Sequence, residues 1–330
     1  MRLDSFVYTV QAMREARARL KPHGVISLAF SMLNDQLGRK IYLMLQDAFG
    51  GYPPLCIQVG YDGGVVFLES EDHQISLAPD CLAQRDFWDK TATYSDPALR
   101  ADVSTDDWPF FYMPQRIYPF SYLVMVGLVL VLALVLIRSF LPGRPQPGVF
   151  PFFCSEPGFM LVETKSITEL GLTFGNSWQV IGLVIAGIMV MAYLANLAVQ
   201  RLRIANAAVA YGLLLAFLAI GWWVARGGGL PSTWAGRFGT ILLLTSPLFF
   251  SGIVFSTLLE GGGEISGIMA ANLFGAMCGG LLEYNSMYFG FQFLYLMAAG
   301  LYALAFVWEL FRPKRARKVI SPARILAARG

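Results

Sequence analysis

Long apolar runs fill the chain from Tyr118 onward and constrain its fold more than any other feature. A helix needs about 20 apolar residues to cross a bilayer core of about 30 Å, because it rises about 1.5 Å per residue. Six segments meet this length: 118–139, 178–199, 204–224, 238–259, 264–283 and 289–310. The sequence therefore predicts an all-α membrane bundle.

The residues before these runs have a different composition. Residues 1–117 carry mixed charges and turn residues, although only 14% of the 330 residues are charged, against about 25% in an ordinary soluble domain. We therefore expect a soluble segment (1–117), a transmembrane bundle (118–311) and a basic C-terminal tail (312–330). Arg312, Lys314, Arg315, Arg317 and Lys318 open the tail and are typical of a membrane anchor.

Charge and cysteine content exclude several classes of function. The net charge of +3 is too small to suggest a nucleic-acid partner. The histidines, His23 and His73, are isolated, and the cysteines lack the spacing of a metal site or disulfide framework. We expect no metal site, and a multi-pass protein of the bacterial inner (plasma) membrane.

Residues 149–174 are a seventh candidate span with polar interruptions. Ser155, Glu156 and Pro157 break the apolar run, and three charges follow at Glu163, Lys165 and Glu169. Each charge at mid-bilayer costs about 2.5–3.5 kcal/mol, but Lys165 and Glu169 can pair at i,i+4 inside a bundle. Charge bias in the loops favours six spans, with 149–174 re-entrant or interfacial.

Two groups of residues in the predicted spans are candidates for function or packing. Polar side chains at membrane depth form a possible intramembrane site: Glu163, Lys165, Glu169, Asn196, Asn272 and Glu283. Small residues recur every four positions in one span: Gly267, Ala271, Gly275 and Gly279. Such a stripe favours close helix packing within the chain over a dimer seam, and structural hydrogen bonds are favoured over a substrate path.

The sequence of the soluble segment predicts part of an α/β sheet. We expect helices over 4–20 and 34–49, with a strand at 25–30 whose apolar run is typical of burial on both faces. Strands at 54–61 and 64–69 are joined around Asp62-Gly63-Gly64, a hairpin signal, and a short helix is expected over 80–92. Elements in this order form the closing part of an open α/β sheet. A whole sheet of this kind needs further parallel strands.

Several stretches resemble one family. They are Leu3–Thr9 and Ala16–Val25 in the soluble segment, Ser104–Tyr112 at its end, and Gly158–Lys165, Phe174-Gly175 and Leu281–Ser286 in the bundle. The soluble stretches resemble the late section of spermidine synthase-like, S-adenosylmethionine-dependent transferases, which have a Rossmann-like methyltransferase fold. The others resemble motifs of the membrane-bound branch, in which 149–174 is a membrane helix. The resemblance thus implies seven spans.

The resemblance implies a transferase acting on a polyamine-like or other small substrate, with S-adenosylmethionine or its decarboxylated form as cofactor. The family's glycine-rich turn and acidic residues would precede Met1, so we assign no catalytic, cofactor-binding or metal residue in this chain. A sheet ending at strand 25–30 has an unpaired edge, which predicts a longer protein or a second polypeptide that completes it. Asp106 and Asp107 are candidates to contact a cationic amine, although a solvated turn is the commoner role of such a pair.

Three functions remain open from the sequence. The chain is the C-terminal part of a membrane transferase that is not catalytically competent alone, or a small-solute transporter, or a structural membrane subunit. Its expected partners are the lipid bilayer, a sheet-completing polypeptide and a second copy of itself.

Overall fold

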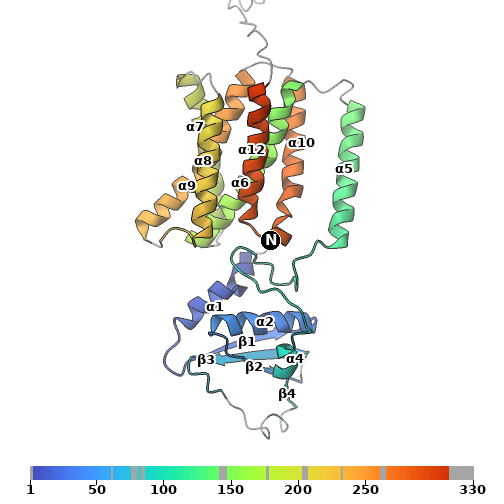
Figure 1. Cartoon of the computed structure of the whole chain (residues 1–330), viewed down its shortest axis with the longest axis vertical. Helices are drawn as coiled ribbons and strands as arrows, with labels where there is room; N and C mark the ends of the chain where they lie inside the picture. The colour runs from blue at the N-terminus through green and yellow to red at the C-terminus, as the bar shows by residue number, and fades with distance from the viewer. Residues whose placement is uncertain are drawn as a thin grey trace, which may run out of the picture. The chain divides into compact units, whose positions relative to one another are not determined.

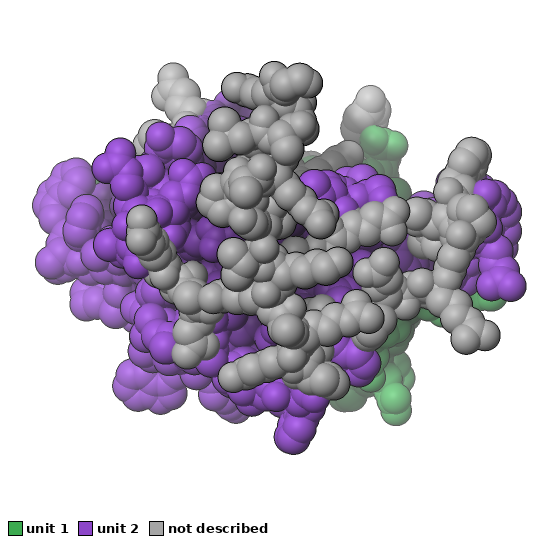
Figure 2. Space-filling model, turned by 90° about the horizontal axis from the view of Figure 1, so that it is seen from above, with its two compact units in different colours: residues 1–123, 285–291 green, residues 124–284, 292–330 purple. Residues whose placement is uncertain are grey.

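The computed structural model divides the chain into two compact parts (Figures 1 and 2). The α/β unit comprises residues 1–123 and 285–291, and the helical unit comprises residues 124–284 and 292–330. The structure describes residues 3–60, 62–75, 80, 82, 86–140, 147–175, 178–202, 207–231, 233–260 and 265–311. The predicted basic tail lies outside these residues, as do residues 81 and 83–85 of the helix predicted over 80–92. The described second half of that range shows the prediction to be wrong, because Trp88–Asp89 form a strand and a separate helix begins at Thr91.

In its described residues, the α/β unit contains short helices and four strands. In chain order they are the 3-10 helix η1 (Leu3–Tyr8), α1 (Val10–Arg17), β1 (Val25–Ser31), α2 (Asp35–Ala48), β2 (Leu55–Gln58), β3 (Gly64–Ser70), β4 (Trp88–Asp89) and α4 (Thr91–Ser95). The single helix predicted over 4–20 is wrong, because the Thr9 side chain accepts the Ala12 amide and starts α1 there. The predicted helix over 34–49 is confirmed, and Asn34 caps it by accepting the Leu37 amide.

The four strands form one sheet in the order β1-β3-β2-β4, and every described pair is antiparallel. The predicted hairpin between β2 and β3 is confirmed, with positive φ at Asp62 and Gly63 as a tight turn requires. Because β1 and β2 both run antiparallel to β3, they are parallel to each other. The α2 helix is therefore the crossover of a β-α-β connection into which β3 is inserted.

One face of the sheet packs against helices. Ile26, Leu28 and Phe30 of β1 contact a core formed by α1, α2 and the inward side chains of β2 and β3. The α2 helix lies along this face (Figure 1). The other face of β1 is open, and Val25 is 51% exposed. The prediction that this strand is buried on both faces is wrong, because its side chains alternate between core and solvent.

The helical unit consists of long helices: α5 (Phe120–Phe140, whose first turn belongs to the α/β unit), α6 (Phe150–Phe174), α7 (Trp178–Leu202), α8 (Ala207–Arg226), α9 (Trp234–Glu260), α10 (Ile265–Glu283) and α12 (Phe293–Phe311). Among the residues that the structure describes, five segments are long and apolar enough to cross a membrane: Val184–Leu202, Ala207–Arg226, Trp234–Glu260, Ile265–Phe289 and Phe293–Phe311. The chain is therefore a helical integral membrane protein.

The α6 helix is the core of the helical unit. It is one continuous helix of 25 residues that contacts α7, α9, α10 and α12. Buried residues recur along its whole length, including Phe152, Leu161 and Leu170. A helix surrounded by other helices can keep polar side chains that a lipid-facing helix cannot.

The segment 285–291, between α10 and α12, belongs to the α/β unit. It contains the short helix α11 (Ser286–Phe289). The Trp108 indole donates to the Met287 carbonyl oxygen at 2.6 Å, and the Phe291 amide donates to the Asp107 carbonyl oxygen at 2.8 Å. The predicted span over 289–310 therefore starts too early, because residues 289–291 pack in the α/β unit and α12 begins at Phe293.

Candidate functional site

A buried ion pair on α6 lies at the contact of this helix with α12. Lys165 Nζ lies 2.8 Å from Glu169 Oε1, one turn further along α6. The Tyr295 hydroxyl of α12 donates to the other Glu169 oxygen at 2.8 Å, and its ring lies 5.6 Å from the Lys165 ammonium. The three side chains therefore satisfy one another across the α6–α12 contact.

Three of the other predicted polar residues, Glu283, Asn272 and Asn196, also bond across helix pairs. Thr164 of α6 donates to Glu283 of α10 at 3.2 Å, and the Asn272 side chain of α10 hydrogen-bonds to Glu156 of α6. Glu163 lies half-buried on α6.

The α7–α9 contact has a polar pair of its own, in which Ser256 donates to the Asn196 side-chain oxygen. The predicted intramembrane residues thus lie at three different helix contacts and do not converge on one point.

The small-residue stripe of α10 packs against α6. A Cβ added to Gly275 would lie 2.7 Å from the Phe153 carbonyl oxygen, and one added to Gly279 would lie 2.8 Å from Pro157 Cα. At Gly267 the nearest atom is 3.8 Å away, on Val149, and Ala271 is half-buried. The favoured interpretation, close packing within the chain, accounts for Gly275 and Gly279, and α6 covers them against a second copy.

The geometry at Gly275 follows from a proline on α6. Pro157 lies inside the helix and has no N–H to donate to the Phe153 carbonyl four residues earlier. That carbonyl oxygen faces Gly275, which has no side chain to keep α10 away. The two backbones can therefore approach closely where the helix ladder of α6 is interrupted.

The two candidate acids at the end of the soluble segment lie in a turn that Thr105 and Trp108 close with reciprocal backbone hydrogen bonds. Asp106 accepts from the Thr9 hydroxyl at 2.7 Å, and burial raises the pKa of its carboxyl group. The turn is therefore the expected one, but Asp106 is half-buried and bonded rather than solvated. The backbone carbonyl of Asp107 accepts the Phe291 amide and so binds the 285–291 segment.

Sequence reasoning missed Lys40, which is fully buried in the α/β unit. Its ammonium group donates to the carbonyl oxygens of Phe110 and Met113 at 2.8 and 2.7 Å and lies 4.3 Å from the centre of the Trp108 ring. A signal was present, because Lys40 follows Leu37 by three residues and precedes Met44 by four, on the apolar face of α2. Lys40 thereby fastens the 110–113 segment to α2.

We expect Lys40 to make the stability of the α/β unit depend on pH. Burial lowers its pKa from 10.5 to about 7, so the unfolded chain binds more protons than the folded chain between these values. The free energy of unfolding should therefore rise with pH, by about 2 kcal/mol between pH 7 and 9. Neutral lysine still has two N–H groups for its two carbonyl acceptors.

Hydrogen exchange of the β3 amides in the full chain, measured in detergent from pH 7 to 9, checks this expectation. Lys40→Met should remove the rise, whereas Lys21→Met, at an exposed lysine, should keep it. A rise of the same size in Lys40→Met would assign it to another group.

Comparisons with family models, curated proteins and solved structures return no match to this chain.

Proposed function

We propose that this chain is the membrane-embedded C-terminal part of a spermidine synthase-like transferase, which becomes competent only when a further polypeptide segment completes its sheet. The observation that supports the proposal is the edge of β1. The sheet has the β1-α2-β2 crossover and inserted β3 with which an open α/β sheet closes, and no described strand pairs with the outer side of β1.

The register shows which groups β1 offers at this edge. Glu71 donates to the Gly24 carbonyl oxygen and Met32 donates to the Gly63 carbonyl oxygen. Because antiparallel pairs alternate, Ile26, Leu28 and Phe30 bond to β3. The N–H and C=O groups of the alternate residues point outward, at Val25, Ser27, Ala29 and Ser31.

Such an edge suits strand addition. Seven residues of extended backbone, with small or β-branched side chains at the four outward positions, leave room for a neighbouring strand. In an open α/β sheet the ligand lies at the carboxyl ends of the central strands, and those strands would lie beyond β1. We therefore place the S-adenosylmethionine-type cofactor and the catalytic groups on the completing segment, with a polyamine-like substrate.

The proposal includes seven membrane spans in a bacterial inner membrane, with α5 and α6 added to the five apolar segments. The α6 helix has 25 residues, which corresponds to about 37 Å at 1.5 Å per residue. Its Lys165–Glu169 pair is satisfied inside the helical unit. The α5 helix has 21 residues and exposed apolar side chains, such as Leu128 and Val131, that suit contact with lipid.

A transporter is not our preferred function, because most of the polar residues that would line a path are bonded to side chains of the helical unit. Lys165 pairs with Glu169 on α6, and Glu169, Glu283 and Asn196 accept hydrogen bonds from neighbouring helices. A purely structural role is not preferred either, because it does not explain why β1 has backbone hydrogen-bonding groups without a described partner strand.

Residue-resolved hydrogen exchange tests the proposal. In the purified chain, the amides of Ser27 and Ala29 should exchange at least about 100-fold faster than those of Leu28 and Phe30, which bond to β3. In native membranes that contain the completing segment, all four should be protected. Ser27→Pro should block the added strand yet keep the β1–β3 bonds, because it removes only an outward N–H.

Labelled S-adenosylmethionine provides the functional readout. Native membranes of the wild type should retain the label, and those of Ser27→Pro and the purified chain should not. Equal, fast exchange of Ser27 and Ala29 in both preparations, or binding of the cofactor by the purified chain, would contradict the proposal.

A further inference from the structure

Two arginines lie at the end of the helical unit where the chain passes from α8 to α9. The two helices pack against each other, and residues 227–233 connect them. With 20 residues, α8 is about 30 Å long, which matches the hydrocarbon core of a bilayer. Its last residue, Arg226, therefore lies at the headgroup level of one leaflet, and so does Arg237 in the first turn of α9. We call residues 222–242 the α8–α9 hairpin.

Both guanidinium groups lie over tryptophan rings of their own helix. Arg226 Cζ lies 5.2 Å from the centre of the Trp222 ring, and Arg237 Cζ lies 5.8 Å from the centre of the Trp234 ring. A planar guanidinium group over an aromatic face keeps its N–H donors at the edge of its plane. Tryptophan side chains are enriched at the headgroup level of membranes. The two pairs therefore present hydrogen-bond donors at the depth where lipid phosphate groups lie.

The helices around these arginines contain almost no acidic side chains. Residues 170–259, which include α7, α8 and all but the last residue of α9, contain neither aspartate nor glutamate. Within the described part of the chain, no ion pair includes Arg226 or Arg237. The α8–α9 hairpin therefore carries two uncompensated positive charges.

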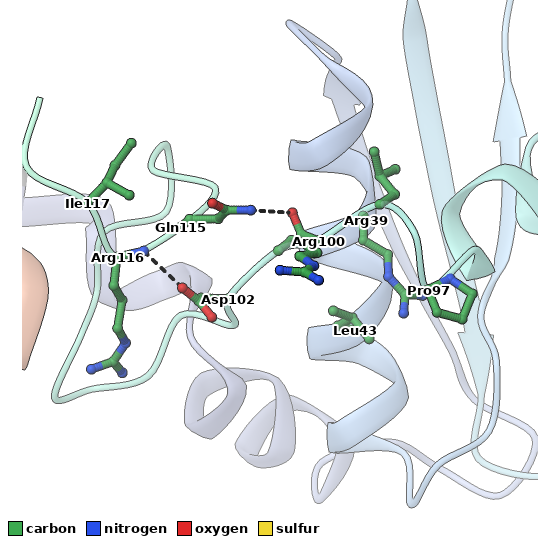
Figure 3. Close-up of a pocket in the computed structure, with 10 residues that line it drawn as sticks. Arg39, Leu43, Pro97, Arg100, Asp102, Gln115, Arg116 and Ile117 are labelled. Atoms are coloured by element: carbon green, nitrogen blue, oxygen red, sulfur yellow. Dashed lines mark hydrogen bonds between the residues drawn. The ribbon is translucent and has the colours of Figure 1, made fainter.

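The arginines of the α/β unit are engaged in a different way. A pocket of about 490 Å³ lies beside α2 (Figure 3). Arg39 of this pocket donates to the Tyr94 carbonyl oxygen at 2.6 Å. The Arg116 guanidinium lies 5.0 Å from the centre of the Trp108 ring and donates to the Tyr288 carbonyl oxygen at 3.4 Å. Figure 3 shows it pointing away from Arg39, so this pocket does not bring its arginines to one anion.

We propose that the α8–α9 hairpin binds anionic phospholipids, with Arg226 and Arg237 each donating to a lipid phosphate group. Guanidinium groups recognise phosphate through paired N–H donors. A zwitterionic lipid also has a phosphate, but its own cation offsets that charge, whereas a net negative headgroup keeps its attraction to the arginines. The Trp234 and Phe238 side chains, 83% and 63% exposed, contact the lipid below its phosphate. This lipid site requires only that α8 and α9 span the membrane, so it is independent of the proposed transferase.

Photo-crosslinking of the full chain in proteoliposomes tests the site. The probes are phosphatidylglycerol and phosphatidylcholine of equal acyl length, each with a diazirine near the headgroup, and labelled residues are mapped by peptide mass spectrometry. Phosphatidylglycerol should label residues 222–242 at least about tenfold more than phosphatidylcholine. Arg226→Gln should weaken the labelling of residues 222–231 about fivefold, and Arg237→Gln that of residues 233–242, because one basic side chain near an anionic surface contributes about this factor.

Arg201→Gln is the matched control, at an exposed arginine in the last turn of α7, and should leave the labelling of 222–242 unchanged within about twofold. Equal labelling by the two probes, or unchanged labelling in the double variant Arg226→Gln/Arg237→Gln, would overturn the proposal. Glycerol 3-phosphate in excess should not compete; if it removes the labelling, the site binds free phosphate esters and not lipid. Absence of all labelling at 222–242 would show that the hairpin is not open to lipid, which also overturns the proposal.

Discussion

Gly275→Leu should prevent the helical unit from folding. The added side chain would start 2.7 Å from the Phe153 carbonyl oxygen and 3.0 Å from Glu156 Cβ, and neither backbone can move without separating α6 from α10. We expect a loss of more than about 3 kcal/mol, because overpacking against backbone has no flexible side chain to relieve it. Size-exclusion chromatography in detergent should show aggregate in place of a single folded peak.

Gly280→Leu is the matched control on the same helix. An added Cβ there meets no atom within 4 Å, so the variant should keep the folded peak and a melting temperature close to the wild type. A folded Gly275→Leu protein that has only changed its oligomeric state would contradict the α6–α10 packing and support a dimer seam.

Glu169→Gln should destabilise the helical unit by about 3–5 kcal/mol, because it leaves the buried Lys165 ammonium without its carboxylate. Lys165→Met should have a comparable effect, since it leaves the Glu169 charge unpaired. The double variant should lose much less than the sum of the two, because neither charge then remains. Thermal unfolding in detergent measures all three.

Two control variants calibrate this cycle. Tyr295→Phe removes one hydrogen bond to Glu169 and should cost about 1–2 kcal/mol. Glu260→Gln, at an exposed position at the end of α9, should have no measurable effect. Additive effects of Glu169→Gln and Lys165→Met would show that the two side chains do not interact in the protein.

Local patterns predicted those elements whose partners are close in sequence. The α2 helix has a capping asparagine and apolar residues at 37, 41, 44, 45 and 48, so it follows from spacing alone. The β2–β3 hairpin follows from its Asp-Gly turn. The antiparallel insertion of β3 between β1 and β2 was not predicted, because β1 pairs with residues about 40 positions later, and such pairing has no local signal.

The candidate site shows the same limit. The Lys165–Glu169 pair was expected from i,i+4 spacing, but its Tyr295 partner lies 126 residues away along the chain. The composition of α6 alone does not predict its buried position, because the partners of Thr164 and Glu169 lie on α10 and α12, 119 and 126 residues later. Lys40 was overlooked for the related reason that its acceptors are backbone carbonyls some 70 residues later.

The α/β unit is built from two separate stretches of the chain, residues 1–123 and 285–291, and this affects its synthesis. Trp108, fully buried, needs the Met287 carbonyl oxygen, and the Asp107 carbonyl needs the Phe291 amide. At translation rates of about 5–20 residues per second, some 10–30 s separate the emergence of residue 123 from that of residue 291. Most of the helical unit must therefore enter the membrane before the fold of the α/β unit can close, and during this interval the nascent α/β chain is exposed to chaperones and proteases.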